Sequence, residues 1–110
     1  MENIKAAIYC RISPFADIFT LTYLCSIQKS LLMEKATATG FNVTDCYEDI
    51  GYSGRDMQRP GLKRLLQDYA DGKFSVVLVV NRERLCKEDA VDPPHWPFLV
   101  LSVPSENCNF

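Results

Sequence analysis

The stretch AAIYCRIS, residues 6–13, is a short apolar segment that ends on an arginine and a serine, and it decides the fold. Side chains of a strand alternate between its two faces, so Tyr9, Arg11 and Ser13 share one face and the intervening apolar residues share the other. In open α/β sheets, ligands bind at the carboxyl ends of the strands. The segment therefore predicts a strand that presents a serine hydroxyl beside a guanidinium, although a serine in this place is more often a turn or cap residue.

The segments that follow alternate between strand and helix patterns. We expect strands over residues 4–11, 41–47 and 75–80, helices over 26–39 and 60–70, and a further strand within 98–103. Ser26 and Gly40 mark the two ends of the first helix, and Pro60 begins the second. Strand and helix in alternation, with short connections, indicate right-handed βαβ units. The predicted fold is therefore α/β, a three-layer sandwich with a mostly parallel sheet of about four strands.

The composition is that of one small globular domain. The chain has 110 residues, of which 47% are hydrophobic and 24% charged, and its net charge is −2. This balance lacks the basic character of a complete nucleic-acid-binding protein, so any affinity for DNA must be local. Five cysteines without a C-x-x-C pair predict reduced thiols and no zinc site. The sequence shows no secretory signal and the apolar segment 15–25 is too short to span a bilayer, so we expect a cytoplasmic location.

Two further stretches add a specific pattern. They are YEDIGYSGRDMQRPGLKRLL at residues 47–66 and VVLVVNRERLCK at residues 76–87. Together with IYCRIS, they resemble the N-terminal catalytic domain of the resolvase/invertase family of serine recombinases. In that family a Tyr-x-Arg-x-Ser strand, a Y-x-D-x-G-x-S-G loop, an Arg-Pro-Gly-Leu helix start and a strand ending in D-R-L-S-R recur in this order. The resemblance covers residues 4–13 and 28–88.

The resemblance implies site-specific DNA recombination. Ser13 is the implied nucleophile, which would attack a DNA phosphodiester and form a 5′-phosphoserine. Guanidinium groups stabilise the charge that develops on phosphorus, because their planar forks donate two hydrogen bonds in a fixed geometry. The implied catalytic cations are Arg11, Arg59, Arg84 and Lys87. The implied supporting residues are Tyr9, Asp49, Ser53, Glu83 and Gln28, the last placed near the start of the first helix. The family needs no metal or other cofactor for strand exchange.

The chain departs from the family pattern in two segments. After Ser13 the family has a polar, flexible loop, whereas residues 14–25 are apolar and begin with a proline. Residues 89–110 form an atypical tail in place of the dimerisation helix and DNA-binding domain that the family would place there. Within the last motif, Glu83, Cys86 and Lys87 replace aspartate, serine and arginine, and a lysine lacks the bidentate geometry of an arginine. We therefore expect a catalytic domain over residues 1–88 of a truncated copy, with reading-frame shifts near residues 14 and 88 as one hypothesis.

Structural interpretations of the same residues remain open. Arg59 lies next to a helix whose first turn is basic, so it fits a solvated charged face, and Glu83 with Arg84 fits a surface ion pair of small energy. Asp49 and Ser53 fit an ordinary turn.

Two other functional classes also remain. The chain fits a non-catalytic remnant that forms homo-oligomers or pairs with an intact recombinase. A hydrolase that uses Ser13 with His95 is disfavoured, because this histidine lies between a proline and a tryptophan in a proline-rich stretch. The motifs of phosphate-binding P-loops and of dinucleotide sites are absent from the sequence.

Overall fold

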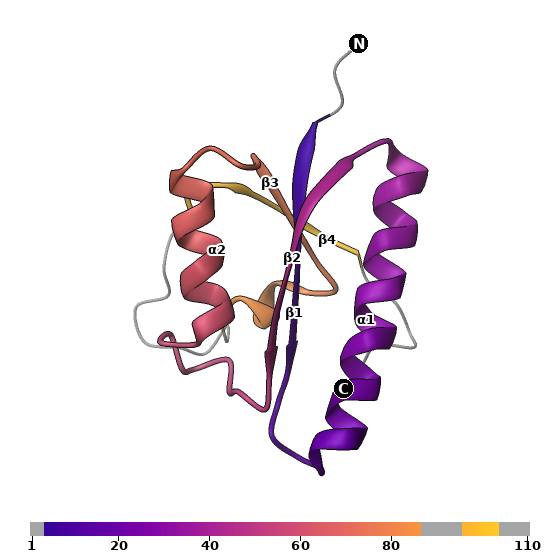
Figure 1. Ribbon diagram of the computed structural model, residues 1–110, viewed down its shortest axis with the longest axis vertical. Helices are drawn as coiled ribbons and strands as arrows, with labels where there is room; N and C mark the ends of the chain where they lie inside the picture. Colours follow the sequence, from indigo (N-terminus) through magenta and orange to yellow (C-terminus); the bar gives the residue numbers. More distant parts are fainter. Residues whose placement is uncertain (1–3, 87–95, 104–110) are drawn as a thin grey trace.

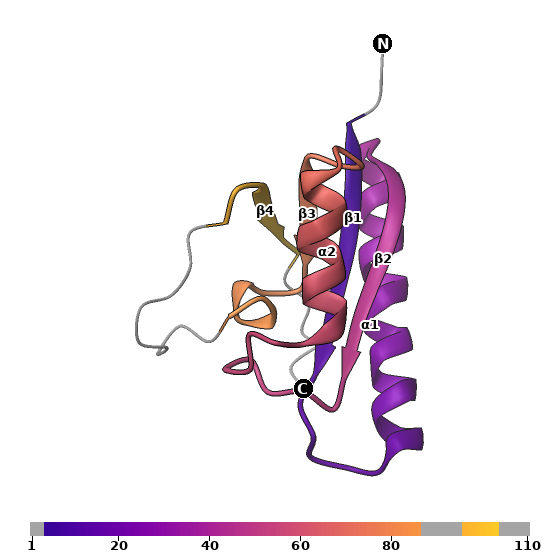
Figure 2. The ribbon, with the colours of Figure 1, turned by 60° about the vertical axis from the view of Figure 1, so that its left-hand side comes forward.

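The computed structural model describes residues 4–86 and 96–103. Its elements, in chain order, are β1 (Lys5–Ile12), α1 (Ile18–Thr39), β2 (Asn42–Ile50), α2 (Pro60–Ala70), β3 (Val76–Val79), the 3₁₀ turn η1 (Arg82–Arg84) and β4 (Leu99–Ser102). The strands form one sheet in the order β2-β1-β3-β4, and all three neighbouring pairs are parallel. Helix α1 covers one face and α2 the other (Figures 1 and 2). The predicted α/β sandwich is confirmed.

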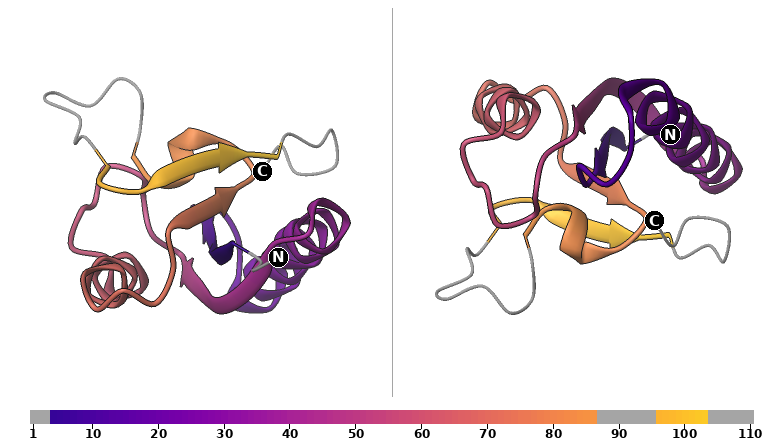
Figure 3. Two further views of the ribbon diagram at one scale, coloured as in Figure 1. Left: turned by 90° about the horizontal axis from the view of Figure 1, so that it is seen from above. Right: turned by 90° about the horizontal axis from the view of Figure 1, so that it is seen from below.

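Strand β1 lies at the centre of the sheet and separates two apolar clusters. Its side chains alternate as predicted: Ile8, Cys10 and Ile12 pack in the cluster beneath α1, and Tyr9 packs in the cluster beneath α2. Strand β3 is buried along its whole length, as its unbroken apolar sequence indicates. Strand β4 lies beside β3 at the edge of the sheet (Figure 3). Both faces of the sheet are thus used for packing, which leaves the carboxyl ends of the strands for polar side chains.

Helix α1 begins eight residues earlier than the sequence pattern predicts. Asp17, not Ser26, is its N-cap: the Asp17 carboxylate accepts hydrogen bonds from the backbone N–H and the hydroxyl of Thr20, at 3.0 and 2.8 Å. The Ser26 hydroxyl instead donates to the carbonyl of Tyr23 inside the helix. The extension forms because Leu21 joins the buried face of the helix and continues it toward the N-terminus. The predicted end at Gly40 is confirmed by its left-handed φ of 85°.

Strand β2 runs three residues beyond the predicted end, to Ile50, so that Asp49 belongs to the strand and not to the loop that follows. From this position its carboxylate accepts hydrogen bonds from the backbone N–H groups of Gly61 and Leu62, at 2.8 and 2.9 Å. The first N–H groups of a helix have no acceptor within the helix itself, so Asp49 supplies one, and the helix dipole also favours a negative charge at this end. The side chain of Arg59, the N-cap residue, makes no capping hydrogen bond. The strand residue Asp49 therefore caps the helix in its place.

Gly61 is required at this junction by lack of space. A Cβ atom there would lie 2.6 Å from the carbonyl oxygen of Glu48 and 2.9 Å from each carboxylate oxygen of Asp49. The close approach allows the carboxylate to reach two amide groups at once.

No helix among residues 4–86 and 96–103 has the length and apolarity needed to cross a membrane.

Replacing Gly61 by alanine tests this junction. In an unhindered helix Gly→Ala is stabilising by up to about 1 kcal/mol. Here the added methyl group must displace backbone or a buried carboxylate, so we expect a loss of about 1–3 kcal/mol in the free energy of unfolding. Urea denaturation followed by circular dichroism measures the change, with exposed Gln67→Ala on the same helix as the control. A Gly61→Ala variant as stable as the natural chain would contradict the described approach of α2 to β2.

Candidate active site

The carboxyl end of β1 places the guanidinium of Arg11 in a buried position, with 1% of the residue exposed. Its Nε donates to the carbonyl of Arg84 and its Nη2 to the carbonyl of Glu83, both at 3.1 Å. Its Nη1 donates to the Ser13 hydroxyl at 3.0 Å and to the carbonyl of Tyr52 at 3.1 Å. One side chain thus joins the end of β1, the loop after β2 and the 3₁₀ turn after β3.

Ser13 is half-buried and lies directly after β1. Its Oγ atom accepts the hydrogen bond from Arg11, so a positive charge lies within 3.0 Å of the hydroxyl oxygen. Such a contact stabilises negative charge on that oxygen or on a phosphate bound to it. The predicted pairing of a strand-end serine with a guanidinium is therefore present in the structure.

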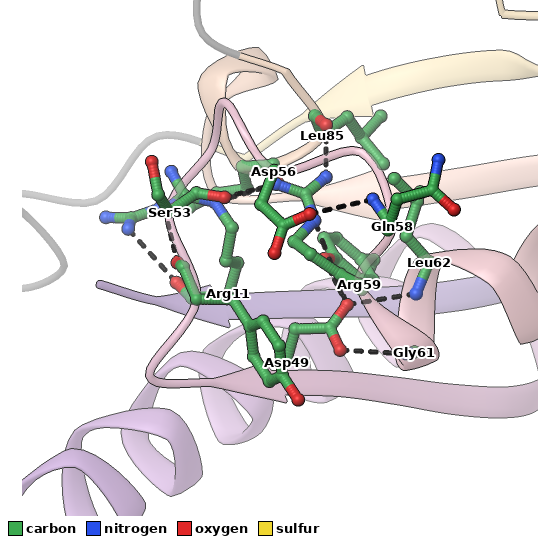
Figure 4. Close-up of polar contacts among 12 residues, drawn as sticks. Arg11, Asp49, Ser53, Asp56, Gln58, Arg59, Gly61, Leu62 and Leu85 are labelled. Carbon is green, nitrogen blue, oxygen red and sulfur yellow. Dashed lines mark hydrogen bonds and ion pairs between the residues drawn. The ribbon is translucent and has the colours of Figure 1, made fainter. Parts of the chain in front are cut away.

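Arg59 is also buried, with none of its surface exposed, and the interpretation of this residue as part of a solvated basic face is wrong. Its guanidinium donates to the carbonyl oxygens of Ser53 and Leu85 and lies 3.9 Å from the Asp49 carboxylate (Figure 4). It also lies over the ring of Tyr9, 5.7 Å from the centroid. The side chain reaches inward because the loop before α2 folds across the end of the sheet.

Arg84 is 6% exposed, so the alternative interpretation that places it at the surface is wrong. Its Nη1 donates to the carbonyl of Arg11 at 3.1 Å, while the Nε of Arg11 donates to the carbonyl of Arg84. This reciprocal pair joins β1 to η1. Two arginines that are 73 residues apart in the chain are therefore in direct contact at the carboxyl end of the sheet.

The buried charges at this end of the sheet do not balance. The charged residues that are buried in the described part of the chain are Arg11, Arg59, Arg84 and Asp49, three cations and one anion. Burial, reinforced by the neighbouring Arg84 and Arg59, lowers the pKa of Arg11 to about 10, so its guanidinium is still charged at neutral pH. Three buried guanidinium groups at one end of the sheet are the kind of group that binds an anion.

The predicted supporting residues differ in what their side chains contact. Asp49 accepts a hydrogen bond from the hydroxyl of Tyr9 at 2.7 Å, and burial with this bond raises the pKa of Tyr9, so both side chains hold the elements together. Gln28 lies in the middle of α1 and not near its start, and its Oε1 accepts a hydrogen bond from the backbone N–H of Arg11 at 3.2 Å. The Ser53 side chain is exposed, and its hydroxyl accepts from the backbone N–H of Arg55 within the loop.

The loop between β2 and α2 is held in place by hydrogen bonds to the end of β1 and within the loop itself. The N–H groups of Gly51 and Tyr52 donate to the carbonyl of Ile12, and Gln58 N–H donates to the Asp56 carboxylate (Figure 4). These contacts orient the Tyr52 carbonyl that Arg11 uses. Sequence reasoning missed the roles of Tyr52 and Leu85, because a carbonyl group belongs to every residue and leaves no signal in the side-chain pattern.

Lys87, a predicted cation, and His95, from the disfavoured hydrolase alternative, lie outside the described residues. Among those described, no group of three histidine, cysteine or acidic side chains is arranged to hold a metal ion. Cys10, Cys25, Cys46 and Cys86 are not in disulfides.

Comparison with known proteins agrees with this geometry. A family model described as "Resolvase, N terminal domain" matches residues 6–92, and no curated protein matches the chain. The N-terminal catalytic domain of TP901-1 integrase is 36% identical, with a TM-score of 0.64 over 76% of this chain and 59% of that one. The C-terminal catalytic domain of ISC1926 TnpA, an IS607-like serine recombinase, is 32% identical, with a TM-score of 0.68 over 76% and 56%.

A resolvase family site-specific recombinase from Streptococcus pneumoniae is 32% identical, with a TM-score of 0.61 over 74% of this chain and 56% of that one. The chain thus spans less than two thirds of the length of each of these solved chains. The family match extends over most of the 110 residues. The chain belongs to the resolvase N-terminal domain family, the catalytic domain of serine recombinases.

Proposed function

We propose that this chain carries the DNA-cleaving site of a site-specific serine recombinase, with Ser13 as nucleophile. The observation that carries the proposal is the 3.0 Å contact between the Arg11 guanidinium and the Ser13 hydroxyl at the carboxyl end of β1. The three buried guanidinium groups at this end of the sheet support a phosphodiester as the substrate group. DNA is the proposed partner and the cytoplasm the proposed location.

In the proposed step, the Ser13 oxygen forms a bond to a backbone phosphorus while its proton passes to solvent. The bond from phosphorus to the 3′ oxygen breaks, and the leaving oxygen takes up a proton to become a free 3′ hydroxyl. The product is a 5′-phosphoserine, which conserves the energy of the phosphodiester for rejoining. Arg11 and Arg84 would stabilise the charge on the non-bridging oxygens, since both belong to the segments that converge beside Ser13. Lys87 is a further proposed cation.

The described contacts require a change before this step. Four of the five N–H groups of Arg11 already donate to protein oxygens: the carbonyls of Tyr52, Glu83 and Arg84 and the hydroxyl of Ser13. A phosphate therefore has to replace some of these acceptors. The exchange is chemically reasonable, because a charged phosphate oxygen is a stronger acceptor than a carbonyl.

The same observation favours a second candidate function. A site whose guanidinium groups are satisfied by backbone carbonyls is also what a non-catalytic remnant would retain, because those contacts maintain the fold. We propose this remnant, able to pair with an intact recombinase, as the alternative. The division into a catalytic domain over residues 1–88 and an atypical tail over 89–110, as in a truncated copy, remains part of both proposals.

A covalent-adduct assay distinguishes the two functions. The purified chain is incubated with a duplex library of random core sequence and analysed by denaturing electrophoresis and by mass spectrometry of tryptic peptides. We expect a DNA-linked species with the phosphate on Ser13, which Ser13→Ala abolishes and the exposed control Ser30→Ala on α1 retains. Failure of the natural chain to form any adduct would overturn the nucleophile assignment and leave the remnant.

The arginines also have a structural role that mutation will reveal. Ala in place of Arg59 removes two hydrogen bonds to carbonyls and leaves the buried Asp49 carboxylate without its cation. We expect a loss of about 3–5 kcal/mol in stability, since breaking one side of a buried pair leaves an uncompensated charge. Exposed Arg82→Ala is the control; equal melting temperatures for the two variants would show that Arg59 is not held as described.

A further inference from the structure

The first half of α1 is unusual for a surface helix because it carries no charge. From Ile18 to Gln28 the sequence is IFTLTYLCSIQ, and the first charged residue is Lys29. Four large apolar or aromatic side chains in and just before this half are exposed, and we refer to them as the α1 patch: Phe15 at 58%, Ile18 at 58%, Phe19 at 85% and Tyr23 at 66%. An amphipathic surface helix would place charged or polar side chains there.

The opposite side of the same turns is already used for packing. Leu21 and Cys25 are buried in the cluster between α1 and the sheet. The helix is therefore apolar on two sides, of which residues 4–86 and 96–103 cover only one. In Figures 1 and 2 the first turns of α1 extend past the carboxyl ends of β1 and β2. A helix that is apolar all round is typical of a buried helix.

The size of the α1 patch fits association with another protein surface. A large aromatic or aliphatic side chain has roughly 200 Å² of surface, so the four exposed fractions amount to roughly 500 Å². Monomeric soluble proteins rarely expose contiguous apolar patches of more than a few hundred Å². Two such patches facing each other would bury roughly 1,000 Å², which reaches the lower limit for a specific but weak interface.

We propose that the α1 patch is a self-association surface, on which a second copy of this chain packs its own α1 in antiparallel orientation. A two-fold interface needs one patch that is complementary to itself, and a row of aromatic and aliphatic side chains meets that need. Residues 18–28 bring no like charges face to face, and the one carboxylate within the row, that of the N-cap Asp17, accepts hydrogen bonds from Thr20.

The interface would lie beside the candidate active site. The backbone N–H of Phe15 donates to the carbonyl of Ser13 at 2.9 Å, so one turn contributes both to the α1 patch and to the site. In the dimer, the second copy would contact the solvent-facing side of the turn from Ser13 to Phe15. The Ser13-bearing turns of both copies would then lie at the same interface. The inference does not depend on the proposed DNA cleavage, since a non-catalytic chain would present the same surface.

Sedimentation equilibrium of the full chain over a wide concentration range tests the proposal. We expect the average mass to rise from that of one chain toward that of two with increasing concentration. Phe19→Lys should weaken the dimer at least about tenfold, because it places a charge at the centre of the interface. Met33→Lys, which makes the same charge change at an exposed position on the other half of α1, should alter the dissociation constant by less than about twofold.

Folding of each variant is checked by circular dichroism. Phe19 is 85% exposed, so Phe19→Lys should melt like the natural chain; if it does not, Tyr23→Lys serves as the second variant for the dimer measurement. A natural chain that stays monomeric at all concentrations would overturn the proposal, as would equal effects of Phe19→Lys and Met33→Lys. A Phe19→Lys variant that dimerises normally but binds a mixed-sequence DNA duplex more weakly would also overturn it and assign the α1 patch to nucleic acid.

Discussion

The structure depends on the burial of guanidinium groups at the carboxyl ends of three parallel strands. Desolvating a cation is costly unless its donors find acceptors, and here the acceptors are mostly backbone carbonyls. The reciprocal bonds between Arg11 and Arg84 join the central strand β1 to the turn after β3, and Arg11 also reaches Tyr52 in the loop after β2. Arg11 can donate to all of these carbonyls at once only when the three segments lie in their present relative positions. Its hydrogen bonds therefore fix that arrangement.

Asp49 supplies the negative charge beside this cluster. It is the one buried carboxylate in the described part of the chain. It accepts hydrogen bonds from the Tyr9 hydroxyl and from two backbone amide groups of α2, and it forms an ion pair with Arg59. Within the described part of the chain, the buried charged side chains at this end of the sheet are three cations and one anion. In the proposed function, the same guanidinium groups would also receive a phosphate.

Several elements could be predicted from the sequence because each has one dominant physical cause. The alternation of residues 6–13, the unbroken apolar run at β3 and Pro60 at the start of α2 all led to the correct element. The start of α1 could not be predicted from caps alone, because Ser26 and Asp17 both have suitable side chains. The burial of Leu21 beneath the extended helix decides between them, and that depends on tertiary packing.

The candidate site was predicted in part for similar reasons. Arg11, Arg59 and Arg84 are identified by motif, and the structure brings all three to one end of the sheet in buried positions. Their hydrogen-bond acceptors were not predictable, since the carbonyls of Tyr52, Ser53, Glu83 and Leu85 carry no side-chain signature. The alternative interpretation of Arg59 as part of a solvated basic face is wrong, because its side chain is fully buried.

We propose that this arginine cluster receives a phosphate beside Ser13 by exchanging backbone acceptors for phosphate oxygens. The decisive measurement is a crystal structure of the natural chain with inorganic phosphate. We expect an anion in hydrogen-bond contact with the Ser13 hydroxyl and the Arg11 guanidinium, with the bond from Arg11 to the Tyr52 carbonyl broken or lengthened. A phosphate-soaked structure in which Arg11 keeps all its present contacts and no anion lies next to Ser13 would contradict it.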